Sequence, residues 1–221
     1  MNYDFLSNNK VYICGEVISE PVFSHEVYGE GFYELMLSVP RLSSHRDVIP
    51  ITISERLLTE KDLAIGNTIA VKGQFRSYNK IFENKSKLML TVFVRELVEP
   101  SESNNPNVIE LVGYVCKPPI FRVTPFSREI CDLLLAVNRA YNKSDYLPCI
   151  AWGRNARYLK NINVGEKIVI TGRIQSREYQ KRLDDGEDVT KVAYEISINK
   201  IASDISILEI EDTQEQFNNN Y

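Results

Sequence analysis

The chain consists of two copies of one sequence pattern, and this repeat limits the folds that it can adopt. Placing Gly15 over Gly113, an offset of 98 residues, aligns ELMLSVPR at 34–41 with DLLLAVNR at 132–139. One extra residue in the second copy moves the offset to 99, and IGNTIAVKGQF at 65–75 then falls on VGEKIVITGRI at 164–174. Identities that stay in register over about sixty residues indicate homologous units. The repeat therefore predicts two domains of the same fold.

Composition places the boundaries of the two copies. We expect copy one at 1–98, a connector at 99–107, copy two at 108–205 and a tail at 206–221. The connector, EPSESNNPN, is rich in Ser, Asn and Pro, which is typical of an exposed flexible linker. The tail is acidic and rich in Asn and Gln, so we expect it to be disordered.

Each copy is predicted to be mostly β. Turn residues in copy two separate strand candidates at 108–115, 130–138, 146–152, 167–179 and 189–202. One helix is expected between the third and fourth strands, at 154–162 in copy two and at 55–63 in copy one. Five strands with one helix at that position are typical of the five-stranded Greek-key barrel called the OB fold. A five-stranded sandwich gives a similar string, but the repeated helix position favours two tandem OB folds.

The third strand of copy two, in YLPCIAWG at 146–153, carries the only tryptophan of the chain. Side chains alternate between the two faces of a strand, so Tyr146 and Trp152 share one face. The other face holds Leu147, Cys149 and Ala151, which suit a core. The two aromatic side chains either fill a core or form a flat surface for a planar ligand, and the strand alone leaves both possibilities open.

Charge is distributed unevenly along a chain whose net charge is −4. Residues 1–98 carry 11 basic and 12 acidic side chains, whereas residues 108–203 carry 15 basic and 11 acidic ones. Residues 204–221 add five acidic side chains and no basic one. A basic copy two fits either a solvated surface or an anionic ligand.

Several classes of function lack their sequence signals. The four cysteines are scattered and the two histidines stand apart from them, so we expect no metal, no cofactor and no disulfide framework. No phosphate-binding loop, nucleophile elbow or zinc-protease motif is present, which argues against an enzyme. No apolar stretch approaches the ~20 residues of a membrane span. The N-terminus does not look like a signal peptide. These features predict a cytoplasmic protein.

Copy two resembles the bacterial single-stranded-DNA-binding protein family. The segments that carry the resemblance are LAVNRAY at 135–141, YLPCIAWGRNARYL at 146–159 and GEKIVITGRIQSREY at 165–179. Copy one resembles it more weakly, through GEVISEP, LSVPR and GNTIAVKGQF. The family forms assemblies of four OB folds. The resemblance therefore implies a homodimer of chains that each contain two OB folds, associated with the nucleoid.

The resemblance also implies a binding site for single-stranded DNA in copy two. Bases stack on four aromatic positions, which here are Tyr141, Tyr146, Trp152 and Tyr179. The basic residues that interleave with them, and would contact phosphates, are Arg128, Arg139, Lys143, Arg154, Arg173 and Arg177. Such a protein acts in DNA replication, recombination or repair, and replication or repair proteins are possible partners.

Copy one and the tail depart from the family pattern. The positions matching Tyr141, Tyr146 and Trp152 are Ser43, Val48 and Ser54, and Tyr78 lies about one residue from the position of Tyr179. Copy one could stack bases on Tyr28, Phe32 or Tyr33 instead, or it could mainly build the assembly. The chain ends in FNNNY where family tails close with Pro-Phe, which leaves partner recruitment open. The alternative function is an accessory, primosomal-type OB-fold protein that acts through protein–protein contacts.

Overall fold

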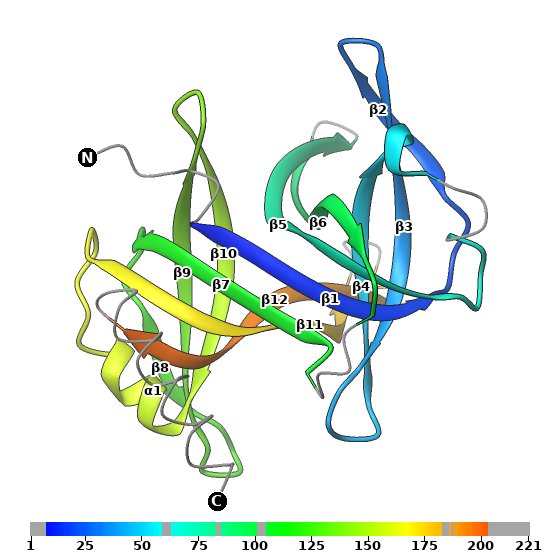
Figure 1. Cartoon of the computed structure of the whole chain (residues 1–221). Coiled ribbons are helices and arrows are strands. Elements are labelled where there is room, and N and C mark those ends of the chain that lie inside the picture. Colours follow the sequence, from blue (N-terminus) through cyan, green and yellow to red (C-terminus); the bar gives the residue numbers. More distant parts are fainter. Residues whose placement is uncertain are drawn as a thin grey trace, which may run out of the picture.

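The computed structural model describes residues 8–58, 63–82, 85–100, 105–182, 186 and 188–202. The expected tail at 206–221 lies outside these residues. Copy one contains β1 Asn9–Val17, β2 Val22–Val27, β3 Glu30–Pro40, β4 Arg46–Ser54, the 3-10 helix η1 Glu55–Leu57, β5 Thr68–Phe82 and β6 Lys85–Val98. Copy two contains β7 Asn107–Val115, β8 Ile120–Val123, β9 Glu129–Arg139, β10 Lys143–Trp152, α1 Gly153–Leu159, β11 Lys167–Arg182 and β12 Asp188–Ala202 (Figure 1).

Each copy closes into a five-stranded barrel. In copy two the order around the barrel is β7, β9, β10, β12, β11 and back to β7, and only the β10–β12 pair is parallel. Copy one closes in the same order through β1, β3, β4, β6 and β5. A helical turn follows the third barrel strand in both copies. This is the OB-fold arrangement, and the expected fold class of two tandem all-β barrels is confirmed.

The barrels form because apolar side chains alternate along their strands. In β7, Ile109, Leu111 and Val115 are buried in the core, whereas Glu110 and Tyr114 on the other face are exposed. At matching positions in β5 and β11, Gly73 and Gly172 lie where the strand is irregular and bends. A Cβ at either glycine would overlap a carbonyl oxygen of the neighbouring strand, so both bends require glycine.

The helices differ from expectation, and each copy has an additional strand. The helix expected at 154–162 ends at Leu159. The amide of Ile162 bonds the carbonyl of Leu159 three residues back, so Ile162 reaches the core from a tight turn. The helix expected at 55–63 is a single 3-10 turn, after which Leu58 is extended and residues 59–62 lie outside the described residues.

The short strands β2 and β8 were missed because their largely exposed side chains show no clear alternation.

The two barrels join through an antiparallel pairing between β1 and β7, which makes one 12-stranded sheet. Val11 faces Ile109 at its centre, and these residues also match each other in the repeat. A pseudo-twofold axis therefore passes through this pair. Figure 1 shows β1 and β7 side by side between the barrels. We call the whole contact region between the copies the seam.

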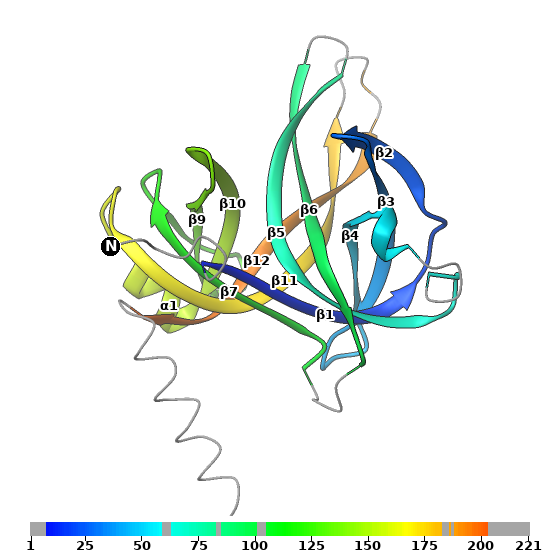
Figure 2. The same cartoon turned by 45° about the horizontal axis from the view of Figure 1, so that its top comes forward.

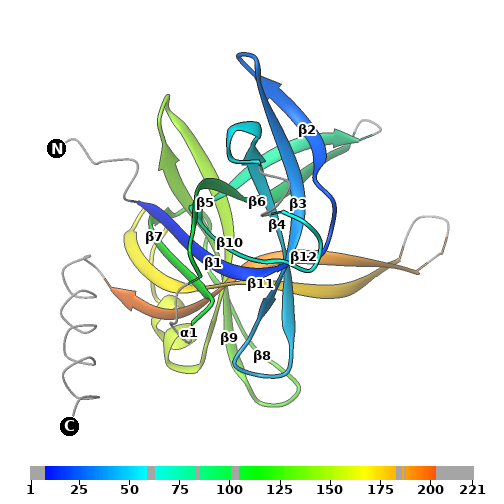
Figure 3. The same cartoon turned by 45° about the vertical axis from the view of Figure 1, so that its right-hand side comes forward.

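Two long hairpins project from the barrels across the seam. The β5/β6 arm of copy one and the β11/β12 arm of copy two extend past their own barrels (Figures 2 and 3). The backbone amide of Ser77 in β5 donates to buried Asp145 of copy two at 2.7 Å. In the same way, the amide of Ser176 in β11 donates to buried Asp47 of copy one at 2.7 Å. Each arm is thus anchored to the other copy by a carboxylate.

Candidate nucleic-acid interface

Strand β10 presents its two large aromatic side chains outward. Tyr146 is 48% exposed and Trp152 is 40% exposed, while Leu147, Cys149 and Ala151 between them lie in the barrel core. Complete burial raises the pKa of the Cys149 thiol, which identifies it as a structural side chain. The geometry therefore excludes core filling as the role of Tyr146 and Trp152.

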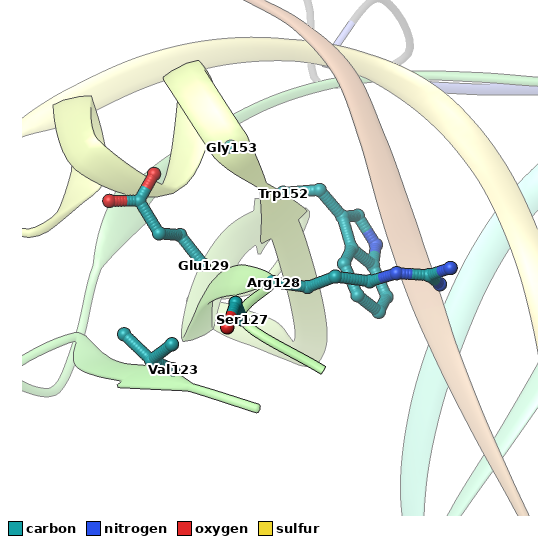
Figure 4. A pocket seen from close by; sticks show the side chains of 6 residues that line it. All are labelled: Val123, Ser127, Arg128, Glu129, Trp152 and Gly153. Carbon is teal, nitrogen blue, oxygen red and sulfur yellow. The ribbon is translucent and has the colours of Figure 1, made fainter. Parts of the chain in front are cut away.

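A cation lies beside the tryptophan. Trp152, Arg128, Ser127, Val123, Glu129 and Gly153 line an open pocket of about 510 Å³. Figure 4 shows Arg128 extending on the side of the Trp152 ring while Glu129 points away from it. Glu129 is paired with Arg157 of α1 at 3.0 Å, so its charge is compensated away from the ring. The pocket can accommodate a planar group on the indole and an anion beside Arg128.

The β9–β10 turn displays the most exposed of the predicted aromatic residues. Tyr141 is 94% exposed, and both it and Asn142 have positive φ, which the tight turn imposes. The turn places Tyr141 between Arg139 and Lys143, which pair across the two strands. Arg139 Nη1 also donates to Asp145 at 3.2 Å. One aromatic ring and two cations therefore meet at this turn.

The fourth predicted aromatic residue lies on the β11/β12 arm. Tyr179 is 38% exposed, and the guanidinium of Arg177 lies 5.9 Å from its ring centroid. Arg177 also approaches Glu195 of β12 at 3.7 Å. Tyr179 and Arg177 thus form a third aromatic–cation group.

Two predicted arginines lie apart from these groups. Arg173 Nη1 donates to buried Asp47 of copy one at 3.1 Å, so it holds the seam together. Burial and the nearby Arg41 lower the pKa of Arg173. Arg154 lines a separate pocket beside Asn155 and Tyr158 of α1 and Lys200 of β12. Neither the contacts of Arg173 nor the pocket lined by Arg154 includes a predicted stacking residue.

Copy one lacks an equivalent aromatic surface in its matching strand. Ser54 bonds Glu30 and caps the amide of Arg56, and Val48 contacts Ser176 of the other copy through its backbone. Tyr78 is offset from the position of Tyr179 by two residues rather than one, because Gly73 and Gly172 occupy equivalent places. Its hydroxyl donates to Glu34 at 2.9 Å. Burial and this bond raise the pKa of Tyr78 to about 12.

Only one of the three substitute aromatics in copy one is free to stack. Phe32 is buried against Phe93 and His25, and Tyr33 packs on the core with its ring edge-on to Phe23. Tyr28, at the β2–β3 turn, is fully exposed. Of these three residues, only Tyr28 is therefore available to stack a base.

The sequence prediction missed two arginines of copy one that lie near Tyr141. Arg76 of β5 and Arg95 of β6 line a pocket together with Arg139, Tyr141 and Lys143 of copy two. The signal was present in the repeat, because GQFRS at 73–77 aligns with GRIQS at 172–176. The two copies exchange an arginine and a glutamine at these positions. Among the described residues no group of three His, Cys, Asp or Glu side chains is placed to hold a metal.

The chain is similar to known proteins in both sequence and structure. The model of the single-strand binding protein family matches residues 106–204. Single-stranded DNA-binding protein 3 of Streptococcus agalactiae is 32% identical over 119 residues, covering 51% of this chain and 80% of that protein. Single-stranded DNA-binding protein 1 of Streptococcus pyogenes is 33% identical over 96 residues, covering 40% of this chain and 74% of that protein.

A solved structure has a similar fold over nearly the whole chain. The single-stranded DNA binding protein from Thermus aquaticus superposes with a TM-score of 0.65 at 19% identity. The superposition covers 88% of this chain and 91% of that one, so it includes both copies. No helix within the described residues is long and apolar enough to cross a membrane. With the Streptococcus relatives aligned over most of their length, the chain belongs to the single-strand binding protein family.

Proposed function

We propose that this protein binds single-stranded DNA without marked sequence preference, in DNA replication, recombination or repair. The observation that carries the proposal is the outward display of aromatic residues beside cations in copy two. Trp152 has Arg128 next to it, Tyr141 has Arg139 and Lys143, and Tyr179 has Arg177. The relatives named above are single-stranded DNA-binding proteins, which favours this function over an accessory role through protein contacts.

The chemistry of the aromatic residues explains why sequence preference is weak. Every base has a π-face, so a flat side chain binds any base, and each stack contributes ~1–3 kcal/mol. The neighbouring cations attract the phosphates that accompany each base. Binding by such groups requires no catalytic residue and no cofactor. The proposed function implies a cytoplasmic location at the nucleoid.

Assembly into a homodimer is part of the proposal. The β1–β7 pairing joins two OB folds within one chain. One further contact between two chains gives four OB folds, the number that the family resemblance implies. The Thermus aquaticus protein, whose chain superposes over both copies, supports the arrangement of two OB folds within one chain.

A fluorescence titration tests the proposed function. Oligo-dT added to the intact protein is expected to quench Trp152, because a base stacks on the indole, and the affinity should fall as salt rises. The same titration of a duplex of equal length is the control and should give much weaker quenching. Absence of both quenching and a gel shift at low salt would refute single-strand binding.

A further inference from the structure

We propose that a pocket at the seam binds a phosphate of the single strand, so that copy one contributes arginines rather than stacking surfaces. This inference rests on the proposed function. The pocket has a volume of about 450 Å³. Its lining residues come from both copies: Val27, Gln74, Arg76 and Arg95 from copy one, and Arg139, Ala140, Tyr141 and Lys143 from copy two. None of these eight described residues carries a carboxylate.

Gln74 holds the two arginines of copy one side by side. Arg76 Nη2 and Arg95 Nη2 both donate to Gln74 Oε1, at 2.9 and 3.1 Å. The guanidinium of Arg76 also lies 3.9 Å from the ring centroid of Phe93, which fixes its plane. Two guanidinium groups sharing one neutral acceptor retain donors for a further ligand.

The cations of the pocket are incompletely compensated. Arg76 Nε is buried and has no hydrogen-bond partner among the described residues. Burial, followed by the charges of Arg139 and Arg95, lowers the pKa of Arg76 to about 10. The carboxylate whose charge acts on Arg76, Asp145, is buried, does not line the pocket and already binds Arg139 and Ser77. An anion in the pocket would relieve the repulsion among the three arginines.

The matching junction on the other side of the pseudo-twofold axis has its own anions. There the arginine and the glutamine have exchanged places, and Arg173 Nη2 donates to Gln175 Oε1 at 3.0 Å. Arg173 is paired with Asp47, and Gln175 donates to Glu195 at 2.7 Å. Glu195 lies opposite Gln175 on the neighbouring strand, whereas the residue opposite Arg76 is the uncharged Thr91. The same fold thus makes one junction charge-compensated and the other basic.

A phosphodiester with its attached base fits the basic junction. Arginine presents a planar fork of N–H donors that matches phosphate oxygens. Tyr141 stands exposed at the edge of the same pocket and can stack the base attached to that phosphate. A strand that leaves the aromatic surface of copy two at Tyr141 therefore meets the arginines of copy one next.

The test removes the two copy-one charges and compares salt dependence. Arg76→Gln with Arg95→Gln should weaken oligo-dT binding about tenfold at low salt, since the variant cannot form the charged hydrogen bonds to phosphate. The slope of log affinity against log salt should become shallower by about 0.7 for each phosphate that the variant no longer neutralises. Quenching of Trp152 at saturation should remain, because copy two still stacks bases.

A matched control removes two charges outside the pocket. Lys10→Gln with Lys72→Gln neutralises two exposed lysines of β1 and β5 that do not line the pocket. Its effect on affinity and salt slope should be clearly smaller than that of the arginine pair. Equal effects would show that only overall charge matters, and would overturn the proposal. Arg95 is exposed, so Arg95→Gln alone tests the pocket if the double variant does not fold.

A second measurement separates a strand phosphate from a free one. Pyrophosphate at constant ionic strength should raise the melting temperature of the wild type more than that of the arginine variant. If the variant loses this shift but keeps full oligo-dT affinity and salt slope, the pocket binds free phosphate and the strand assignment is wrong. Failure of the wild type to bind oligo-dT would refute the proposed function itself. Oligo-dT binding that is the same in the wild type and the arginine variant would refute only the phosphate pocket.

Discussion

The two buried carboxylates of the seam should differ in their contribution to stability, although they occupy matching positions of the repeat. Asp47 and Asp145 are both fully buried. Asp47 accepts hydrogen bonds from Arg41 Nε at 2.8 Å, Arg41 Nη2 at 2.6 Å, Arg173 Nη1 at 3.1 Å and the Ser176 amide at 2.7 Å. It is therefore paired with two arginines and with the other copy at once.

Asp145 has fewer partners. It accepts from the Ser77 amide at 2.7 Å and from Arg139 Nη1 at 3.2 Å, while its Oδ2 is buried without a hydrogen-bond partner among the described residues. Burial raises the pKa of Asp145, against the lowering effect of its hydrogen bond to Ser77 and of Arg139. The second arginine is missing because copy one has Gln74 at the position of Arg173.

The expected costs follow from these partners. Asp47→Asn breaks a buried ion pair with two arginines and should lower the free energy of unfolding by about 3–5 kcal/mol. Asp145→Asn removes one longer charged bond but also a buried charge that the fold disfavours, as the raised pKa of Asp145 indicates, so it should cost at most about 1 kcal/mol. For a protein of this size a loss of 1 kcal/mol lowers the melting temperature by about 2–4 °C. Asp47→Asn should therefore lower it by about 6–20 °C, and Asp145→Asn by at most about 4 °C.

Urea unfolding followed by circular dichroism and by Trp152 fluorescence measures these costs. Asp132→Asn is the matched control, because Asp132 forms a similar two-bond pair with Arg122 on the surface. Such exposed pairs contribute about 0–1 kcal/mol. Equal costs at Asp47 and Asp145, or a larger cost at Asp145, would refute the assignment of the stabilising junction to Asp47.

Three further results are expected. Trp152→Ala with Tyr146→Ala should nearly abolish oligo-dT binding in a gel shift, whereas Tyr28→Ala should change it little; an equal loss would give copy one its own stacking surface. The mass in solution at micromolar concentration should be twice the 25.4 kDa of one chain, and a monomer mass would contradict the homodimer. Because the pKa of Asp145 in the folded protein lies above its ordinary 3.8, the folded state takes up this proton more readily. The free energy of unfolding of the wild type, relative to that of Asp145→Asn, should therefore increase as the pH is lowered from about 7 to about 4. A difference that stays constant over this range would contradict the raised pKa of Asp145.

The sequence predicted the barrels well because their signals are local and repeated. Alternation along β10 placed Leu147 and Cys149 in the core and Trp152 on the opposite face, which the structure shows to be the exposed one. The repeat then extended the same architecture to copy one. The short strands β2 and β8 gave no such signal, since each pairs only with one barrel strand and its own side chains are mostly exposed on both faces.

The seam was harder to predict, because its contacts join residues far apart in the chain. Asp47 and Asp145 could be aligned from the repeat, but nothing local shows that each carboxylate bonds the arm of the other copy. For the same reason Arg173 was predicted as a phosphate contact, whereas the structure pairs it with Asp47. Its role in binding stays a prediction.

Joining the two folds in one chain permits their junctions to differ. In a symmetric dimer of identical one-fold chains, each residue occurs at both junctions, so an arginine added at one is added at the other. Here the exchange between GQFRS and GRIQS places Arg173 against Asp47 at one junction and Arg76 in an open pocket at the other. The first arrangement stabilises the fold through a closed ion pair. The second leaves cations available to a ligand, at a junction where Asp145 compensates less of their charge. We therefore expect the Asp47 side of the seam to stabilise the fold and the Asp145 side to bind phosphate.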